Sequence, residues 1–361
     1  MDIVLSLCDT LFLDRFYATV LPASKISSSP DVFVYANQTD SGYNSSRIPS
    51  SVEGYSLISA IQLDQMIGLL PGKYASLSVL ARDDPARQFF SLFVITWFFG
   101  CLLYFVSSTL SYIFVFDKDT FKHPKFLKNQ IRQEIWVSVK SHPGMSLLTA
   151  PFFLAEVRGW TLLFDNANDY GRFYFYFQFP LFLMFTDGLI YLIHRGLHHP
   201  SIYRYLHKSH HKWIMPSPYA SHAFHPVDGW AQSLPYHLFP FILPLWKYAS
   251  VGLFVFVNIW TVMIHDGEYV ANSPIINGAA CHTMHHLYFN YNYGQFTTLW
   301  DRLGGSYRPP NLELFYKETK MSKAEVEKQV KEMEQMVKEV EGDDSFREYA
   351  ATDGSEVRKR K

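Results

Sequence analysis

The chain has 361 residues, of which 48% are hydrophobic and 17% aromatic, and its formal net charge is −1. This charge gives no electrostatic support for a role in binding nucleic acid. Its three cysteines, Cys8, Cys101 and Cys281, lie far apart in the sequence. That spacing argues against a disulfide framework and against a zinc module ligated by cysteines.

The first 88 residues are mixed in composition and are expected to form a lumenal segment. No basic region follows Met1, so a cleaved secretory signal is not expected. Residues 22–54 are rich in Ser, Pro and Asn and predict a loop. Two glycosylation sequons, at Asn37 and Asn44, lie in this loop.

Residues 89–193 are expected to hold transmembrane helices. Residues 89–116 carry no charge, and about 20 apolar residues suffice for a helix to cross a bilayer. Residues 144–164 predict a second, weaker span, because they include two charged side chains. Residues 173–193 predict a third, with Asp187 as its only charge.

A fourth apolar region, residues 236–264, holds two stretches that are each short for a full crossing. They are expected to form a hairpin that enters the membrane and returns. The loop 117–143 has more basic than acidic side chains, so the positive-inside rule predicts that it is cytosolic. This orientation places the sequons and residues 165–172 in the lumen, and everything after Ile193 except the hairpin in the cytosol.

The charged tail, residues 313–361, is expected to be cytosolic and to include an amphipathic helix. Ser322 and Glu325 have the spacing of a capping box. The apolar residues that follow recur at alternating intervals of four and three: Val326, Val330, Met333, Val337 and Val340. The favoured interpretation is a helix packed on its own domain rather than a coiled coil with a partner.

Histidines cluster strongly in the second half of the chain, since 13 of the 15 lie between His194 and His286. Three groups have the spacing of metal ligands. They are His194, His198 and His199; His207, His210 and His211; and His282, His285 and His286. Residues at i, i+3 and i+4 project from one face of a helix, so each group can bring two or three imidazoles to one small volume. Imidazole is uncharged when it binds, and it suits iron, zinc and copper.

Other polar residues near these groups are candidates for additional ligands or for supporting positions. His265, at the cytosolic end of the hairpin, is a further candidate ligand, and His222 and His225 are candidates either for ligands or for supporting positions. Asp187 lies on the same predicted helical stripe as His194, and we expect it to accept a hydrogen bond from a ligand imidazole. His123 and His142 lie in the basic loop and are expected to be solvated.

The predicted topology brings all three groups to the same face of the membrane, as a shared site requires. Eight to ten histidines exceed the four ligands of one zinc and suffice for two metals with open positions. Metal-bound O2 at iron can attack an unactivated C–H bond of a lipid, which water-activating zinc cannot do. The chain has no haem, flavin or nicotinamide motif, so electrons are expected from a partner protein.

The histidine motifs resemble those of the membrane fatty acid hydroxylase superfamily and, within it, the sterol 5-desaturases. The resemblance covers residues 85–312. It rests on the three groups and on the stretches Ser221-His222-Ala223-Phe224-His225-Pro226-Val227-Asp228-Gly229, Ile264-His265-Asp266-Gly267, Tyr291-Asn292-Tyr293-Gly294-Gln295 and Leu299-Trp300-Asp301-Arg302-Leu303-Gly304-Gly305. The long N-terminal segment and the charged tail are similar to those of fungal members.

The resemblance implies a di-iron, O2-dependent enzyme of the endoplasmic reticulum membrane. Cytochrome b5 and its NADH-dependent reductase would supply its electrons, and it would introduce the carbon 5–6 double bond into a 7-ene sterol such as episterol on the ergosterol route. The implied iron ligands are drawn from His194, His198 or His199, His207, His210, His211, His265, His282, His285 and His286. Cys281 stands where some relatives have another histidine.

The sequence therefore predicts an all-α integral membrane protein with about four transmembrane helices or hairpin segments and a cytosolic di-iron domain. This histidine-rich domain is expected to comprise residues 194–312, including the membrane hairpin. A sterol 4-methyl oxidase or a lipid hydroxylase is the alternative within the same superfamily, since ligand spacing does not reveal the fate of the substrate radical. A non-catalytic metal-binding membrane protein is the alternative from another class.

Overall fold

The computed structural model describes residues 1–23, 73–269 and 273–350. Most of the predicted loop, with both sequons, therefore lies outside the described residues. The chain divides into two compact units, one made of residues 1–95 and 150–160 and the other of residues 96–149 and 161–361. The division falls within two long helices, α4 (Pro85–Phe114) and α5 (Gln130–Val157).

The first unit contains α1 (Asp2–Cys8), the π-helix η1 (Asp9–Leu13) and α2 (Asp14–Val20). A buried ion-pair network joins them to the start of α4. Arg87 donates hydrogen bonds to Asp9 at 2.8 Å and to Asp14 at 2.6 Å. Because a buried charge needs a partner, this network fixes the N-terminal helices within the unit.

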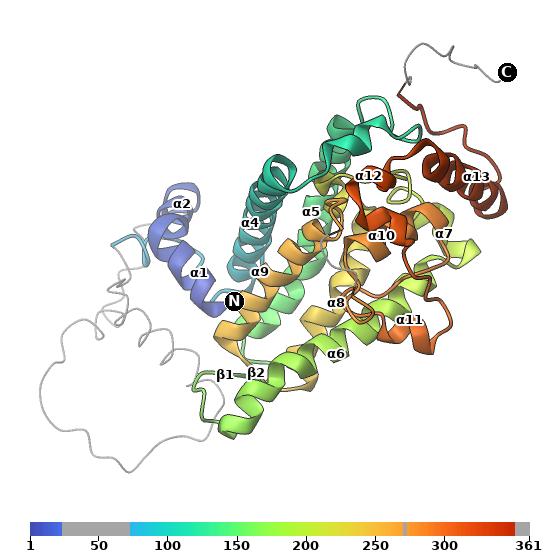
Figure 1. Cartoon of the computed structure of the whole chain (residues 1–361). Coiled ribbons are helices and arrows are strands. Elements are labelled where there is room, and N and C mark those ends of the chain that lie inside the picture. The colour runs from blue at the N-terminus through green and yellow to red at the C-terminus, as the bar shows by residue number, and fades with distance from the viewer. Residues whose placement is uncertain (24–72, 270–272, 351–361) are drawn as a thin grey trace, which may run out of the picture. The chain divides into compact units, whose positions relative to one another are not determined.

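The second unit is built almost entirely of helices in its described residues (Figure 1). After the parts of α4 and α5 that belong to it, its helices are η3 (Lys118–Lys122), α6 (Gly171–Leu197), α7 (Pro200–Leu206), η4 (Pro218–His222), α8 (Pro226–Ile242), α9 (Lys247–Met263), α10 (Ala279–Tyr288), α11 (Leu299–Leu303), η5 (Leu312–Phe315), α12 (Lys317–Lys320) and α13 (Lys323–Val340). Its only described sheet pairs β1 (Leu163–Phe164) in parallel with β2 (Leu245–Trp246).

Two described helices, α4 and α6, are long and apolar enough to cross a membrane. They correspond to the spans predicted at residues 89–116 and 173–193. Phe98, Leu110 and Phe114 of α4 are exposed, and such a large apolar surface calls for a covering of lipid or protein. Both helices therefore have the length and composition of membrane-spanning helices.

The other two stretches predicted to enter the membrane, residues 144–164 and 236–264, differ from these two long apolar helices. Residues 144–157 of the second stretch lie in α5, which begins at Gln130 and so includes a polar first half. Residues 236–264 lie in two separate helices of 17 residues each, α8 and α9, joined through β2. Neither α8 nor α9 reaches the length of a full crossing by itself.

Two apolar cores hold the second unit together. In one, Phe182 of α6 packs against Phe239 of α8, with ring centroids 5.1 Å apart, and Val257 of α9 joins them. In the other, Met284 and Tyr288 of α10 pack with residues of α13. All ten residues of α10 are buried, so His282, His285 and His286 lie inside the protein.

The helix predicted in the charged tail is confirmed as α13, which lies beside α10 (Figure 1). The Ser322 side chain accepts a hydrogen bond from the backbone N–H of Glu325, as the capping box requires. Met333 and Val337 of the predicted stripe are buried against α10. The tail therefore packs on its own domain.

A residue beyond α13 contacts the sequence motif that contains His207, His210 and His211. Arg347 is buried and donates hydrogen bonds to the backbone carbonyls of His211, at 2.7 Å, and Lys212, at 3.2 Å. Its guanidinium also pairs with Glu341 at 2.9 Å and Asp344 at 2.8 Å. The tail thus fixes the backbone at one of the candidate ligands.

Replacing Arg347 with Met is expected to lower the free energy of unfolding by about 3–5 kcal/mol, because the buried Glu341 carboxylate would lose its close cationic partner and keep only the Tyr203 hydroxyl, at 2.7 Å, and Lys208, at 3.9 Å. Thermal unfolding of the detergent-solubilised protein measures the change. Lys331→Met, on the exposed face of α13, is the control and should shift stability by no more than about 0.5 kcal/mol. Equal unfolding temperatures for the two variants would contradict the proposed contact.

Candidate metal centre

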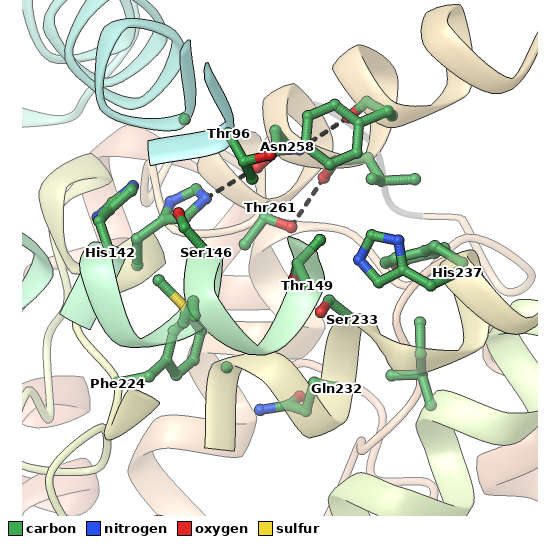
Figure 2. Close-up of a pocket in the computed structure, with 18 of the residues that line it drawn as sticks. Thr96, His142, Ser146, Thr149, Phe224, Gln232, Ser233, His237, Asn258 and Thr261 are labelled. Carbon is green, nitrogen blue, oxygen red and sulfur yellow. Dashed lines mark hydrogen bonds between the residues drawn. The ribbon is translucent and has the colours of Figure 1, made fainter. Parts of the chain in front are cut away.

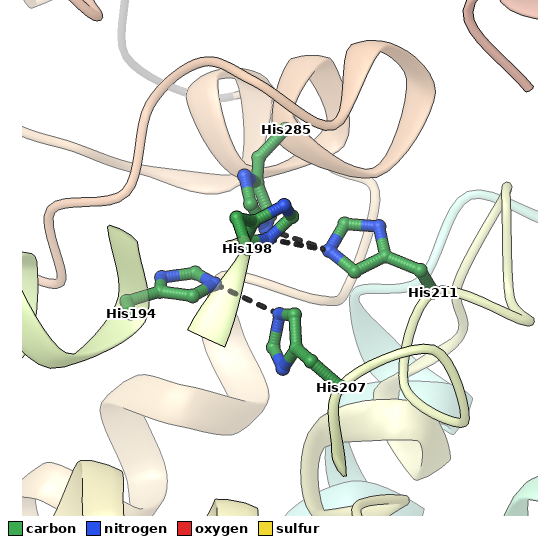
Figure 3. A group of neighbouring side chains, drawn as sticks. All are labelled: His194, His198, His207, His211 and His285. Atoms are coloured by element: carbon green, nitrogen blue, oxygen red, sulfur yellow. Dashed lines mark hydrogen bonds between the residues drawn. The ribbon is translucent and has the colours of Figure 1, made fainter. Parts of the chain in front are cut away.

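Nine buried histidines of the second unit form two compact groups. The first group is His194, His198, His207, His211 and His285; the second is His210, His265, His282 and His286. Within each group the candidate ligand nitrogens all lie within 4.8 Å of one another. Figure 3 shows the five imidazoles of the first group pointing toward a common centre.

The two groups touch, and adjacent residues of the chain are divided between them. His211 belongs to the first group and its neighbour His210 to the second, while His285 and His286 are divided in the same way. The rings of His211 and His286 have centroids 5.0 Å apart. Each H-x-x-H-H motif therefore contributes to both groups, with residues four apart kept together.

Hydrogen bonds on the far side of the rings determine which nitrogen carries the proton in three members of the first group. Nδ1 of His194 lies 2.9 Å from the carbonyl oxygen of Tyr293, and Nδ1 of His285 lies 2.7 Å from that of Tyr291. Nδ1 of His207 lies 2.8 Å from the Asp228 carboxylate. Because these oxygens only accept hydrogen bonds, each Nδ1 carries the proton and each Nε2 presents a lone pair.

The resulting lone pairs face one another. Nε2 of His194 lies 3.2 Å from Nε2 of His207, yet neither nitrogen has a proton to place between them. In the second group, Nδ1 of His265 lies 2.6 Å from the carbonyl oxygen of Thr261, and its Nε2 lies 2.9 Å from Nε2 of His282. Facing lone pairs repel unless a cation lies between them.

The spacing of these nitrogens fits a metal ion. Two ligands at a right angle, each bonded to a metal at about 2.1 Å, would have nitrogens about 3 Å apart. The nitrogens of His211 and His285 lie 3.0 Å apart, and those of His211 and His198 lie 3.1 Å apart. The two donor sets consist only of imidazoles and fit metal ions of borderline softness such as iron.

Burial favours the uncharged form of seven of these imidazoles. Burial, reinforced by repulsion from neighbouring imidazoles, lowers the pKa of His198, His210, His211, His282, His285 and His286 well below the ordinary value. Burial also lowers the pKa of His265 to about 4. A neutral imidazole is the form that binds a metal, so the groups are ready to bind one near neutral pH.

The structure brings together nine of the ten histidines named from the sequence and leaves His199 apart. The His199 side chain is exposed and caps α7 through Ser201, whose hydroxyl oxygen lies 2.6 Å from Nδ1. Cys281 is buried but belongs to neither group. Of the pair that the sequence left open, His198 therefore lies at the candidate centre.

Two further candidates also lie outside both groups. His225 caps α8 by accepting from the backbone N–H of Val227. His222 bonds to Asn258 at 3.1 Å. The expectation that His123 and His142 are solvated is wrong, since both are buried by neighbouring helices and loops.

The expectation that Asp187 accepts from a ligand imidazole is also wrong. Its carboxylate accepts instead from the backbone N–H groups of Gln295, Phe296 and Thr297, and from the Thr297 hydroxyl. A buried loop needs acceptors for its amides, and Asp187 supplies them. Since Tyr293, at the start of this loop, holds His194, the effect of Asp187 on the imidazoles is indirect.

The carboxylate that does contact an imidazole is Asp228, a role that the sequence reasoning missed. Asp228 is fully buried and accepts from His207 at 2.8 Å and from the side-chain N–H of Gln232 at 2.8 Å. A carboxylate hydrogen-bonded to a ligand histidine is common at metal sites. The available signal was an acidic residue three positions after His225, at the start of an otherwise apolar helix.

Comparisons with known proteins agree with this geometry. Residues 179–306 match the Fatty acid hydroxylase family. The chain is 61% identical over 347 residues to a Delta(7)-sterol 5(6)-desaturase of Aspergillus fumigatus, covering 95% of this chain and 96% of that protein. It is 47% identical over 357 residues to the Delta(7)-sterol 5(6)-desaturase of Saccharomyces cerevisiae, covering 97% of each.

No solved structure matches the chain. The likeness to the curated relatives extends over nearly their whole length. The chain therefore belongs to the family of the fungal Delta(7)-sterol 5(6)-desaturases.

Proposed function

We propose that this protein is a sterol desaturase that introduces the carbon 5–6 double bond into a 7-ene sterol, such as episterol, during ergosterol biosynthesis. One observation carries the proposal: a chain 61% identical to a Delta(7)-sterol 5(6)-desaturase keeps nine buried imidazoles in two touching groups. Removing two hydrogens from the sterol supplies two electrons. Reduction of O2 to two waters needs four, so a donor supplies the other two together with two protons.

Two iron ions are the metals that we assign to the two groups. His194, His198, His207, His211 and His285 would hold one, and His210, His265, His282 and His286 the other. When bound, iron activates O2 for attack on an aliphatic C–H bond. The two groups would offer the ions five and four neutral donors.

Other residues of the chain would aim the imidazoles. Asp228 and the carbonyls of Tyr293, Tyr291 and Thr261 each hold an Nδ1 proton and so turn a lone pair toward the centre. Such partners commonly change metal affinity by about 10- to 100-fold. The backbone of Tyr293 is itself held by Asp301, which accepts from its N–H at 2.9 Å.

The electron donors we propose are cytochrome b5 and its NADH-dependent reductase, because the sequence has no cofactor motif of its own. We place the protein in the endoplasmic reticulum membrane with its histidine groups and C-terminus in the cytosol. In this arrangement residues 1–88 are lumenal, residues 89–193 cross the membrane, residues 194–312 form the catalytic domain and residues 313–361 form the tail. The loop charge and the sequons support this topology.

Microsomes that contain the protein should convert a 7-ene sterol, with NADH and O2, into a 5,7-diene. The conjugated diene is measured by its ultraviolet absorbance. Heat-treated microsomes are the control. A product oxidised at the 4-methyl group, or a hydroxylated sterol with no diene, would instead assign the protein to the alternative activity within the superfamily.

Adjacent histidines provide a matched pair of variants. His198→Ala should abolish diene formation, because a buried donor of the first group is lost, while His199→Ala should retain most of the activity. Immunoblotting confirms that both proteins accumulate to the wild-type level. The reverse pattern would show that His199 is the ligand.

Asp228→Asn is expected to weaken iron binding by about 10- to 100-fold, because the amide holds the His207 proton less strongly than a carboxylate does. Iron retained during titration with a chelator measures this change without requiring turnover. Asp119→Asn, at a partly exposed site outside both histidine groups, is the control. If Asp228→Asn retained as much iron as the wild type, Asp228 would have no role in holding the metal.

A further inference from the structure

A cavity lies among α4, α5, α8 and α9, within the second unit. Its walls combine apolar side chains such as Ile190, Phe254 and Val257 with several polar ones (Figure 2). The polar residues labelled in the figure include Thr96, His142, Ser146, Asn258 and Thr261. A mainly hydrocarbon molecule with one polar group matches such a lining.

The cavity shares its wall with the candidate metal centre. The ring of Phe224, which lines the cavity, lies 4.4 Å from the ring of His210, measured between centroids. Gln232, also in the lining, donates to Asp228, the carboxylate that holds His207. Phe224 therefore separates a molecule in the cavity from His210, and Gln232 with Asp228 separates it from His207.

Asn258 has unused hydrogen-bonding capacity in this wall. Its Nδ2 donates to the carbonyl of Phe254 at 2.7 Å, which fixes the orientation of the amide. Its Oδ1 lies 3.1 Å from Nε2 of His222, and the amide oxygen accepts from that ring. A carboxamide has two N–H donors and two acceptor positions, so one of each remains.

Thr96 offers a second unused group. Its hydroxyl oxygen is buried and has no hydrogen-bond partner among the described residues, although the residue lines the same cavity. A buried hydroxyl without a partner is unfavourable, so it calls for a ligand or a water. The spare groups of Asn258 and Thr96 can serve a ligand hydroxyl, which both donates and accepts.

We propose that this cavity binds the substrate sterol and that Asn258 and Thr96 recognise its 3-hydroxyl group, an inference that rests on the proposed function. The hydroxyl is the only polar group of such a sterol, so it alone can satisfy these side chains. Asn258 lies in α9, which ends at Met263, two residues before His265 of the second group. Anchoring the hydroxyl at this helix would therefore hold the neighbouring 5–6 bond on the side of the cavity nearest the metal centre.

The His222–Asn258 contact gives a role to a histidine that lies outside both groups. The ring of His222 packs edge-on against Tyr104, with centroids 5.3 Å apart, and Ser221 lies 3.0 Å from its Nδ1. These contacts fix the ring, and the ring fixes the Asn258 oxygen. His222 is thus a positioning residue for sterol recognition.

A competition assay tests this assignment. Microsomes receive equal amounts of a 3-hydroxy-7-ene sterol and the same sterol without its hydroxyl, and mass spectrometry measures the two 5,7-dienes. Their ratio gives the ratio of kcat/KM values and does not depend on how much active enzyme is present. The variants are Thr96→Val and Asn258→Leu, with Thr96→Ser as the control that keeps the hydroxyl.

The wild type should favour the hydroxylated sterol, and Thr96→Val and Asn258→Leu should each lower that preference by about tenfold, the size of one hydrogen bond. Thr96→Ser should keep the wild-type ratio. A wild-type ratio in Thr96→Val and Asn258→Leu, or no preference in the wild type, would overturn the inference while leaving the desaturase function intact. If Asn258→Leu fails to accumulate, the comparison of sterol preference between Thr96→Val and Thr96→Ser tests the inference. Absence of both dienes in the wild type would instead refute the proposed function, and the inference with it.

Discussion

The candidate metal centre depends on the hydrogen bonds that turn imidazole lone pairs toward one another against their mutual repulsion. Carbonyl and carboxylate acceptors bind the Nδ1 protons of His194, His207 and His285, and this forces their Nε2 lone pairs toward one another. Such an arrangement is unfavourable in a buried site by itself, and a bound cation makes it favourable. Folding energy from the surrounding apolar cores and ion pairs therefore maintains a site whose own donors repel.

The supporting contacts come from distant parts of the chain. Asp187 and Asp301 bind the amides of the loop that carries Tyr293, and Arg347 binds the carbonyl of His211. Buried charges with several hydrogen bonds tolerate little movement, because any displacement leaves a charged group unpaired. The described part of the tail accordingly packs into the second unit, although its composition resembles that of a solvated appendage.

Much of the site could be predicted from local spacing. The two H-x-x-H-H motifs identified six of the nine clustered histidines, the H-x-x-x-H spacing identified His194 and His198, and His265 followed from its place after the hairpin. Spacing alone predicts that histidines four residues apart, such as His207 and His211, share one face of a helix. It does not predict that the histidine between them, His210, joins the other group. For that reason the division of His210 from His211 became visible only in the fold.

Asp228, Arg347 and the burial of His142 depend on contacts between segments remote in sequence, which no local pattern encodes. The predicted role of Asp187 failed because the stripe it shares with His194 also faces the amides of the 295–297 loop.

The central claim is that the two groups hold a pair of irons. Protein purified without oxygen from cells grown on enriched 57Fe can be examined by metal analysis and Mössbauer spectroscopy. The account predicts two irons per chain, with spectra that show two nitrogen-rich sites in one centre. A single iron per chain in fully active protein, or activity that persists with zinc alone, would contradict it.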